Sequence, residues 1–163
     1  MTIRVLWPTR SANLPKDDNI FAIIFIMQKL LASDKVYISK SGILDAGRGV
    51  YARRDIKKGE MIERCPIIEV SKNDTSNLKE SVLVTYFFYF GKNKERLAIV
   101  LGFGSIYNHS YKPNATYKMK SREKTIDFIA IDDIKKDDEI TFNYSNCSNP
   151  KGKENPLWFE VNK

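Results

Sequence analysis

The chain has 163 residues, of which 42% are hydrophobic and 12% aromatic, so it is long enough for one domain with a packed core and unlike a disordered sequence. Its 27 Lys and Arg residues against 20 Asp and Glu give a formal charge of +7, but bases and acids are interleaved, so nucleic-acid binding is permitted rather than indicated. The two cysteines, Cys65 and Cys147, do not make a disulfide framework, and a reducing, intracellular compartment is the simplest expectation.

Residues 1–34 are expected to form an N-terminal arm followed by an apolar helix. The run IFAIIFIM at residues 20–27 is closed by a glutamine and a lysine, well short of the length of a membrane span. Asp17 and Asp18 precede the run, where acids favour a helix N-terminus and where a signal peptide would carry basic residues. We therefore expect an acid-capped helix laid on the domain, with a membrane anchor as the less favoured alternative.

From residue 35 onward, short segments rich in β-branched and aromatic residues alternate with turn residues. This pattern predicts an antiparallel β fold of several small sheets. The segments are KVYIS (35–39), GVYARR (49–54), MIERC (61–65), IIEV (67–70), ATYKM (115–119), TIDFIAI (125–131) and EITFNY (139–144). The segment SVLVTYFFYF (81–90) is ambiguous between strand and helix, and we favour a short helix or helical turn there.

Two segments share a frame of strand, Asp-Ile-Lys-Lys, acidic turn and strand: VYARRDIKKGEMI (50–62) and FIAIDDIKKDDEI (128–140). The simplest interpretation is a surface turn in which the lysines and acids are solvated and the isoleucine anchors the loop. The shared frame predicts two similar strand–turn–strand units within one domain.

The chain's single histidine, His109, lies in GSIYNHSYKPNA (104–115). A transition-metal site needs several ligands, and the chain has no second histidine and no CxxC spacing, so no metal site is expected. A Ser or Cys nucleophile is also disfavoured, because the chain has no GxSxG elbow. Taken alone, this histidine would be interpreted as a partly buried side chain hydrogen-bonded to backbone groups.

The neighbours of His109 favour a binding site instead. Gly102 and Gly104 let the backbone approach another group closely, and Asn108 with the adjacent backbone suits the polar edge of a heterocycle such as adenine. Far upstream, DAGRGVYA (45–52) places two glycines around an arginine before a strand. That signal is weak, because it lacks the third glycine and the helix of a dinucleotide site.

In this order and spacing, GRGVYA, YNHSYKPNA and EITFNY resemble the SET domain of protein-lysine methyltransferases, especially the minimal SET proteins of bacteria and large DNA viruses. The resemblance implies a SET domain over residues 35–145 and a post-SET-like tail over 146–163. It implies a mainly β fold of the β-clip type, with several short antiparallel sheets around a pseudoknot-like crossing, an N-terminal helix and few other short helices. In that crossing, the C-terminal segment passes through a loop and brings the second and third motifs together.

The resemblance also implies a cofactor site for S-adenosyl-L-methionine. Gly47, Arg48 and Gly49 match the turn whose backbone lines the methionine part of that cofactor. Asn108 and His109 match the pair that holds it, largely through main-chain hydrogen bonds and packing around the adenine. His109 is therefore expected to be a placement residue, neither an acid–base catalyst nor a metal ligand.

A lysine channel is implied beside the cofactor site. Tyr144 matches the family's near-invariant tyrosine and is expected to organise catalysis where the two pockets meet. Tyr86 resembles the upstream channel tyrosine, with Tyr89 as a competitor. Phe142 matches a position that helps set how many methyl groups fit, and a phenylalanine slightly favours di- or trimethylation. Trp158 would add an aromatic wall over the pocket, or would simply dock the tail on the core.

The tail departs from many eukaryotic relatives, because Cys147 stands alone and cannot build their zinc cluster. The predicted function is S-adenosylmethionine-dependent methyl transfer to a lysine of a histone or other basic protein. A homodimer through residues 20–31 is a further expectation, and no membrane or nucleic-acid partner is expected. Location would be cytoplasmic, or nuclear at host chromatin for a histone substrate. The alternatives are a catalytically inactive SET-fold binding module and, more remotely, a nucleic-acid-binding β domain using YKMKSREK (117–124).

Overall fold

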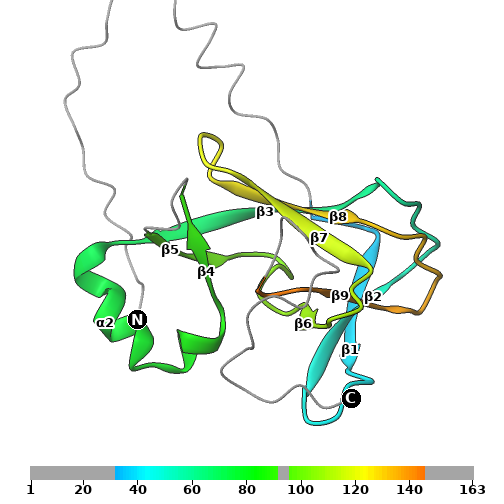
Figure 1. Cartoon of the computed structure of the whole chain (residues 1–163), viewed down its shortest axis with the longest axis horizontal. Coiled ribbons are helices and arrows are strands. Elements are labelled where there is room, and N and C mark those ends of the chain that lie inside the picture. The colour runs from blue at the N-terminus through cyan, green and yellow to red at the C-terminus, as the bar shows by residue number, and fades with distance from the viewer. Residues whose placement is uncertain (1–31, 92–95, 146–163) are drawn as a thin grey trace, which may run out of the picture.

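Strands dominate the computed structural model, which describes residues 32–91 and 96–145 (Figure 1). The prediction of a mainly β fold with few short helices is confirmed. The strands are β1 (Val36–Lys40), β2 (Arg48–Ala52), β3 (Met61–Val70), β4 (Phe87–Phe90), β5 (Arg96–Val100), β6 (Asn108–His109), β7 (Ala115–Lys120), β8 (Thr125–Ala130) and β9 (Glu139–Phe142). Between β3 and β4 lie the 3₁₀ turns η1 (Lys72–Asp74) and η2 (Val82–Thr85), with helix α2 (Thr75–Lys79) between them.

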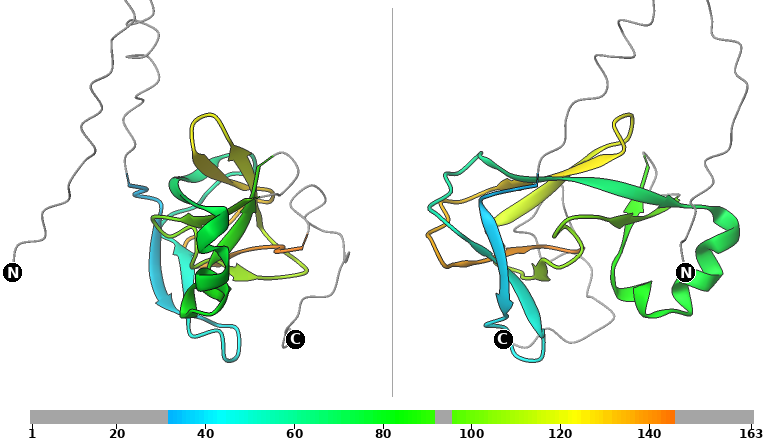
Figure 2. Two further views of the ribbon diagram at one scale, coloured as in Figure 1. Left: turned by 90° about the vertical axis from the view of Figure 1, so that its left-hand side faces the viewer. Right: turned by 180° about the vertical axis from the view of Figure 1, so that it is seen from behind.

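The strands are linked through successive pairings in the order β1-β2-β9-β7-β8-β3-β5-β4, and β6 pairs with β9. Most pairings are antiparallel, as expected, but β9 runs parallel to both β6 and β7. The rotated views in Figure 2 show β9 passing between the β1–β2 hairpin and the β7–β8 hairpin. The small sheets therefore join into one continuous arrangement, and β9 connects segments that are far apart in the chain.

Strand β3 ties the two ends of the molecule together. Its first half pairs with β8 and its second half pairs with β5 (Figure 1). A bulge lies between Met61 and Glu63, near the start of the strand. An extra residue at a bulge bends and twists the strand. The ten-residue length of β3 lets one strand pair with the β7–β8 hairpin over Met61–Pro66 and with the β4–β5 hairpin over Ile67–Val70, and residues of both hairpins line a cavity described below.

The core is formed by apolar side chains that alternate along the strands, as half-buried sheets require. In β8, for example, the apolar Ile126, Phe128 and Ala130 are buried on one face, although Thr125 and Asp127 on the other face are buried as well. The remaining members of the main cluster come from every part of the described chain: Val36, Val50, Ala52, Ile56, Ile62, Cys65, Val100, Tyr107, Ala115, Ile134, Ile140 and Phe142.

The two Asp-Ile-Lys-Lys turns dock on each other, which the sequence did not predict. Ile56 and Ile134 are fully buried and exchange two backbone hydrogen bonds of 2.9 Å each. Around them, Lys57 pairs with Asp133 at 2.8 Å and Lys135 pairs with the aspartate of the first turn at 3.0 Å. The prediction of two similar units with anchoring isoleucines and solvated lysines is confirmed.

The segment 81–90 contains both of the structures between which its sequence was ambiguous. Residues Val82–Thr85 form η2, as favoured, but Phe87–Phe90 form β4, so the helical expectation was wrong for the second half. The reason is pairing with β5, a strand that the sequence analysis missed, which leaves Phe90 fully buried. The expected N-terminal helix and the tail lie outside the described residues, and no helix among the described residues is long and apolar enough to cross a membrane.

Candidate active site

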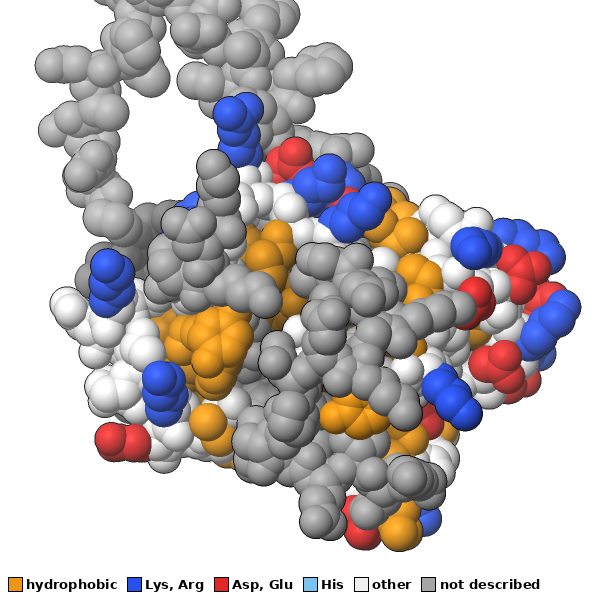
Figure 3. All heavy atoms as spheres, viewed as in Figure 1, with side chains coloured by type: hydrophobic (Ala, Val, Ile, Leu, Met, Phe, Trp, Pro, Cys, Tyr) orange, Lys and Arg blue, Asp and Glu red, His pale blue; other side chains and the backbone are white. Residues whose placement is uncertain are grey.

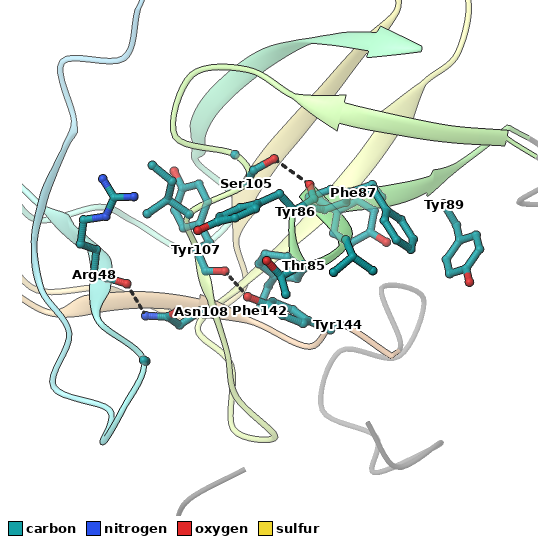
Figure 4. A pocket seen from close by; sticks show the side chains of 16 residues that line it. Arg48, Thr85, Tyr86, Phe87, Tyr89, Ser105, Tyr107, Asn108, Phe142 and Tyr144 are labelled. Carbon is teal, nitrogen blue, oxygen red and sulfur yellow. Dashed lines mark hydrogen bonds between the residues drawn. The ribbon is translucent and has the colours of Figure 1, made fainter. Parts of the chain in front are cut away.

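A cavity of about 500 Å³ opens where the loop before β2, the η2–β4 segment, the loop before β6, and strands β7 and β9 meet (Figure 4). Five of the residues predicted for the site line it together: Arg48, Tyr86, Asn108, Phe142 and Tyr144. The other lining residues are Ala46, Val84, Thr85, Phe87, Phe88, Tyr89, Gly104, Ser105, Ile106, Tyr107 and Tyr117.

The parallel pairing of β6 with β9 brings the two central motifs into contact. Asn108 lies beside Thr141 and His109 beside Phe142 in the register of the two strands. This pairing carries Tyr144 to the segment before β6, where its hydroxyl donates to the Tyr107 carbonyl oxygen at 2.6 Å (Figure 4). Residues more than 30 positions apart in the chain thus share one corner of the cavity.

The hydroxyl group of Tyr144 is held in its neutral form. The residue is 38% exposed, but desolvation by the surrounding protein raises the pKa of its phenol, and the nearby Tyr86 raises it further. The Tyr144 ring also packs against Phe142, with ring centroids 4.8 Å apart. A neutral phenol keeps one proton to donate to Tyr107 and retains lone pairs that can accept a hydrogen bond from a ligand in the cavity.

His109 supports this tyrosine from behind. Its Nδ1 accepts a hydrogen bond of 3.1 Å from the Tyr144 backbone N–H, so Nδ1 carries no proton. The side chain is buried, and burial lowers the pKa of the imidazole to about 4. Its Nε2 is also buried and has no hydrogen-bond partner within the described part of the chain. A neutral imidazole in this position aligns the Tyr144 backbone, and His109 itself is not among the residues that line the cavity.

Asn108 uses its side-chain nitrogen within the protein. This Nδ2 shares its two N–H groups among three acceptors: the Arg48 carbonyl oxygen at 2.9 Å, Glu139 Oε1 at 2.8 Å and Ser41 Oγ at 3.1 Å. These contacts tie β6 to the β1–β2 hairpin and to β9. The idea that this amide nitrogen is free for a heterocycle is therefore not supported, and its contribution at the cavity is to fix the position of the Arg48 backbone.

The two glycines around Arg48 are required for different reasons. Gly47 has φ of +71° and nothing within 4 Å of the place where a Cβ would stand, so its requirement is conformational. A Cβ on Gly49 would come within 2.2 Å of Glu139 Oε1, so that glycine makes room for the carboxylate. Neither glycine is among the lining residues, and both shape the loop that presents Arg48.

The inner end of the cavity is aromatic. The Phe142 ring stacks on Phe88 at 5.8 Å and meets Tyr117 edge-on at 5.4 Å. Tyr86 lies among the labelled side chains near Ser105 and Tyr107, whereas Tyr89 stands apart at the rim and is 53% exposed (Figure 4). This placement favours Tyr86 over Tyr89 as the channel tyrosine.

Tyr107, Tyr117 and Ser105 also line the cavity, although they were not predicted from the sequence. The alternation along β7 puts Tyr117 on the same face as the buried Ala115, so a signal for it was present in the two-residue period. Tyr107 and Ser105 carried no such signal, because they lie in a loop. Within residues 32–91 and 96–145, no three His, Cys, Asp or Glu side chains are placed to hold a metal ion.

Comparison with known proteins places this site in a family. A family model described as the SET domain matches residues 47–145. The chain belongs to the SET-domain family. A "Histone-lysine N-methyltransferase, H3 lysine-37 specific" from Schizosaccharomyces pombe is 31% identical over 115 residues, which are 70% of this chain and 71% of that protein. The predictions of a SET domain and of the protein-lysine methyltransferase class are confirmed by these matches.

Solved structures of SET proteins have the same fold. A candidate histone methyltransferase from Plasmodium falciparum is 36% identical with a TM-score of 0.54, covering 68% of this chain and 92% of that one. The polycomb repressive complex 2 of Chaetomium thermophilum, bound to S-adenosylmethionine, is 24% identical with a TM-score of 0.59. That match covers 72% of this chain and 16% of the other, and it shows likeness of fold alone.

Proposed function

We propose that this SET domain transfers a methyl group from S-adenosyl-L-methionine to a lysine side chain of a histone or another basic protein. The observation that carries the proposal is the meeting of Tyr86, Phe142 and Tyr144 at one end of a cavity whose other lining includes Arg48 and Asn108. One end of the cavity is aromatic and suits a lysine side chain, and the other end is formed by loops whose backbone groups suit the cofactor. The two ligands could therefore meet within one cavity.

The residues present fit this cofactor. A cavity of about 500 Å³ lies in the size range of cofactor sites. The loop containing Gly47, Arg48 and Gly49 and the segment at Asn108 and His109 would hold the cofactor through main-chain groups, since the Asn108 side-chain nitrogen is engaged within the protein. When bound, the cofactor supplies a positively charged sulfonium methyl group.

The aromatic end would align the lysine and keep water out. A lysine amine must be neutral to attack, and an apolar, water-poor wall favours the neutral amine by desolvation. The Tyr144 hydroxyl donates its hydrogen bond to the Tyr107 carbonyl oxygen, so the lone pairs of the hydroxyl oxygen would be available to orient the amine. Alignment of two groups held in contact supplies most of the acceleration expected for such a transfer.

Two further features of the channel belong to this proposal. Phe142 has no hydroxyl to retain a restricting water, which slightly favours di- or trimethylation. Trp158 would close the lysine pocket with an aromatic wall, but this residue lies outside the described part of the chain. The substrate would be a histone or another basic protein, as the name of the fission-yeast relative suggests, with nuclear location following from a histone substrate. A homodimer is also proposed.

The decisive experiment incubates the protein and radiolabelled S-adenosylmethionine with histones and with whole-cell extract. Tyr144→Phe should lower labelling by about a hundredfold, because it removes the hydroxyl that orients the amine. Tyr37→Phe is the matched control, since it removes a tyrosine hydroxyl that bonds to Asp137 at 2.9 Å and does not line the cavity, and it should label normally.

Calorimetric titration with S-adenosylmethionine separates the alternatives. Cofactor binding without labelling of any protein would identify an inactive SET-fold binding module. Equal labelling by the wild type and Tyr144→Phe would contradict the role given to Tyr144. Salt-sensitive retention of DNA or RNA without cofactor affinity would point to a nucleic-acid-binding domain.

A further inference from the structure

A carboxylate is buried directly behind the site. Glu63, on β3, is 6% exposed and accepts two hydrogen bonds of 3.2 Å, one from the Phe103 backbone N–H and one from the Tyr107 hydroxyl. Burial raises the pKa of this carboxyl, and the hydrogen bonds oppose that rise. Burying a carboxyl group lowers the stability of the fold unless the group is hydrogen-bonded. The donors around Glu63 must therefore stay in place.

The segment 101–107 is folded around this carboxylate. Gly102 has φ of +69°, and a Cβ there would lie 2.5 Å from Glu63 Oε1. Phe103 contacts one carboxylate oxygen near the start of the segment, and Tyr107 contacts the other at its end. Glu63 therefore fixes both ends of the segment from inside the core.

The same segment contacts both tyrosines of the channel (Figure 4). Ser105 Oγ donates to the Tyr86 carbonyl oxygen at 3.0 Å, and the Tyr107 carbonyl oxygen accepts from the Tyr144 hydroxyl at 2.6 Å. The Tyr107 ring is 1% exposed and stacks on Phe128 with centroids 4.6 Å apart, so it cannot rotate without disturbing the core.

We propose that Glu63 is a positioning residue for the methyl transfer, acting through Tyr107 on the orientation of the Tyr144 hydroxyl. The inference rests on the proposed function. The carboxylate anchors the Tyr107 phenol, the phenol sets the angle of its own backbone carbonyl, and that carbonyl fixes the direction of the Tyr144 O–H bond. Tyr107 and Glu63 contact neither reacting group in this scheme.

The test uses Tyr107→Phe, which deletes one hydroxyl and keeps the ring stacked on Phe128. With S-adenosylmethionine and a histone substrate, we expect kcat to fall about fivefold to tenfold while KM for the cofactor stays within about twofold. Glu63→Gln should have a smaller effect, because its remaining carbonyl oxygen can still accept one of the two hydrogen bonds. The double variant should be no worse than Tyr107→Phe, because the two groups act as one unit.

Asp127→Asn is the matched control for a general loss of stability. Asp127 is a second buried carboxylate, 5% exposed, and pairs with Arg64 Nε at 2.6 Å, and neither residue lines the cavity. It should lower the melting temperature without lowering kcat beyond about twofold. A kcat of Tyr107→Phe equal to that of the wild type, or a fall matched by Asp127→Asn, would overturn the proposal.

A readout independent of activity keeps the proposal separate from the proposed function. The Tyr144 ¹³Cζ NMR signal should shift in Tyr107→Phe and stay in place in Asp127→Asn. If the wild type shows no turnover, the proposed function fails, but this signal still reports whether Tyr107 orients the Tyr144 hydroxyl. An unmoved Tyr144 signal in Tyr107→Phe would disprove the positioning role.

Discussion

Phe142 is the residue on which the proposed degree of methylation depends. Its ring closes the aromatic end of the cavity against Phe88 and Tyr117, so a hydroxyl added at its para position would bring a polar atom among these rings. Such a hydroxyl can hold a water molecule where a methyl group would otherwise fit.

We therefore expect Phe142→Tyr to shift the products toward monomethyl-lysine at similar total turnover. Mass spectrometry of the modified peptide, after reaction with excess cofactor, measures the ratio of mono-, di- and trimethyl-lysine. Tyr37→Phe is the control, because it removes a tyrosine hydroxyl that lies outside the cavity lining and should leave the ratio unchanged. An unchanged ratio in Phe142→Tyr would remove Phe142 from the account of methylation degree.

His109 makes stability depend on pH. Its folded-state pKa of about 4 lies below the ordinary value of 6.5, because burial disfavours the charged ring. Below pH 6.5 the unfolded chain binds a proton that the folded chain refuses, so this contribution is complete above 6.5 and is lost as the pH falls toward 4.

With about 1.4 kcal/mol for each pKa unit, the free energy of unfolding should fall by on the order of 2 to 3 kcal/mol across this range. Urea unfolding of the wild type and His109→Asn at several pH values measures the effect. Other groups, including Glu63 with its raised pKa, titrate in both proteins and cancel in the difference. Parallel profiles for the two proteins would show that His109 does not cause the dependence.

At the scale of elements, the two docked turns separate apolar from ionic stabilisation. The ion pair of Lys57 and Asp133 is largely exposed, with side-chain exposures of 72% and 53%. Figure 3 shows acidic and basic side chains interleaved at this end of the molecule, on the right. The isoleucines beneath them are buried, so most of the stabilisation should come from packing.

Ile56→Ala should lower the free energy of unfolding by about 3 kcal/mol, as expected for an aliphatic side chain removed from a core. Lys57→Ala should lower it by less than about 1 kcal/mol, because exposed pairs contribute little. Chemical unfolding of both variants measures the two losses in the free energy of unfolding and so compares apolar packing with the ion pair. Comparable losses would mean that the ionic pairs, rather than the isoleucines, hold the turns together.

At the scale of the whole molecule, the cavity depends on β9 holding segments from three parts of the chain. Two asparagines clamp this strand. Asn108 bonds to the Glu139 side chain at 2.8 Å, and Asn114 bonds to the Glu139 carbonyl oxygen at 2.8 Å and to the Thr141 N–H at 2.9 Å. Only the first of the two lines the cavity.

Cofactor binding should therefore stabilise the fold and should distinguish the two asparagines. S-adenosylmethionine at about a hundred times its Kd should add about 2.7 kcal/mol, seen as a rise in melting temperature. Asn114→Ala should melt lower than the wild type but keep this rise, whereas Asn108→Ala should lose most of it. Equal rises in both variants would show that the Asn108 side chain, which fixes the Arg48 backbone, is not needed to organise the cofactor site.

Sequence and structure agree where the signal is local. The strand segments were predicted because their alternation and residue types depend only on neighbours in the chain, and His109, Asn108 and Tyr144 were singled out by the motifs that contain them. The second half of the segment 81–90 was mistaken, because its strand exists through pairing with β5. No local pattern records that partner.

The sequence by itself determined the residue types of the site and the mainly β class. The family resemblance implied that the second and third motifs meet, but only the tertiary structure decided which side chains come into contact, because the parallel pairing of β6 with β9 and the docking of the two turns join positions far apart in the chain. The position of Glu63 was also decided only by the tertiary structure, because in the sequence it is an ordinary polar residue within a strand. Its burial beneath the segment 101–107 follows from the bulge in β3 and from Gly102, and such long-range geometry has no signature in a linear pattern.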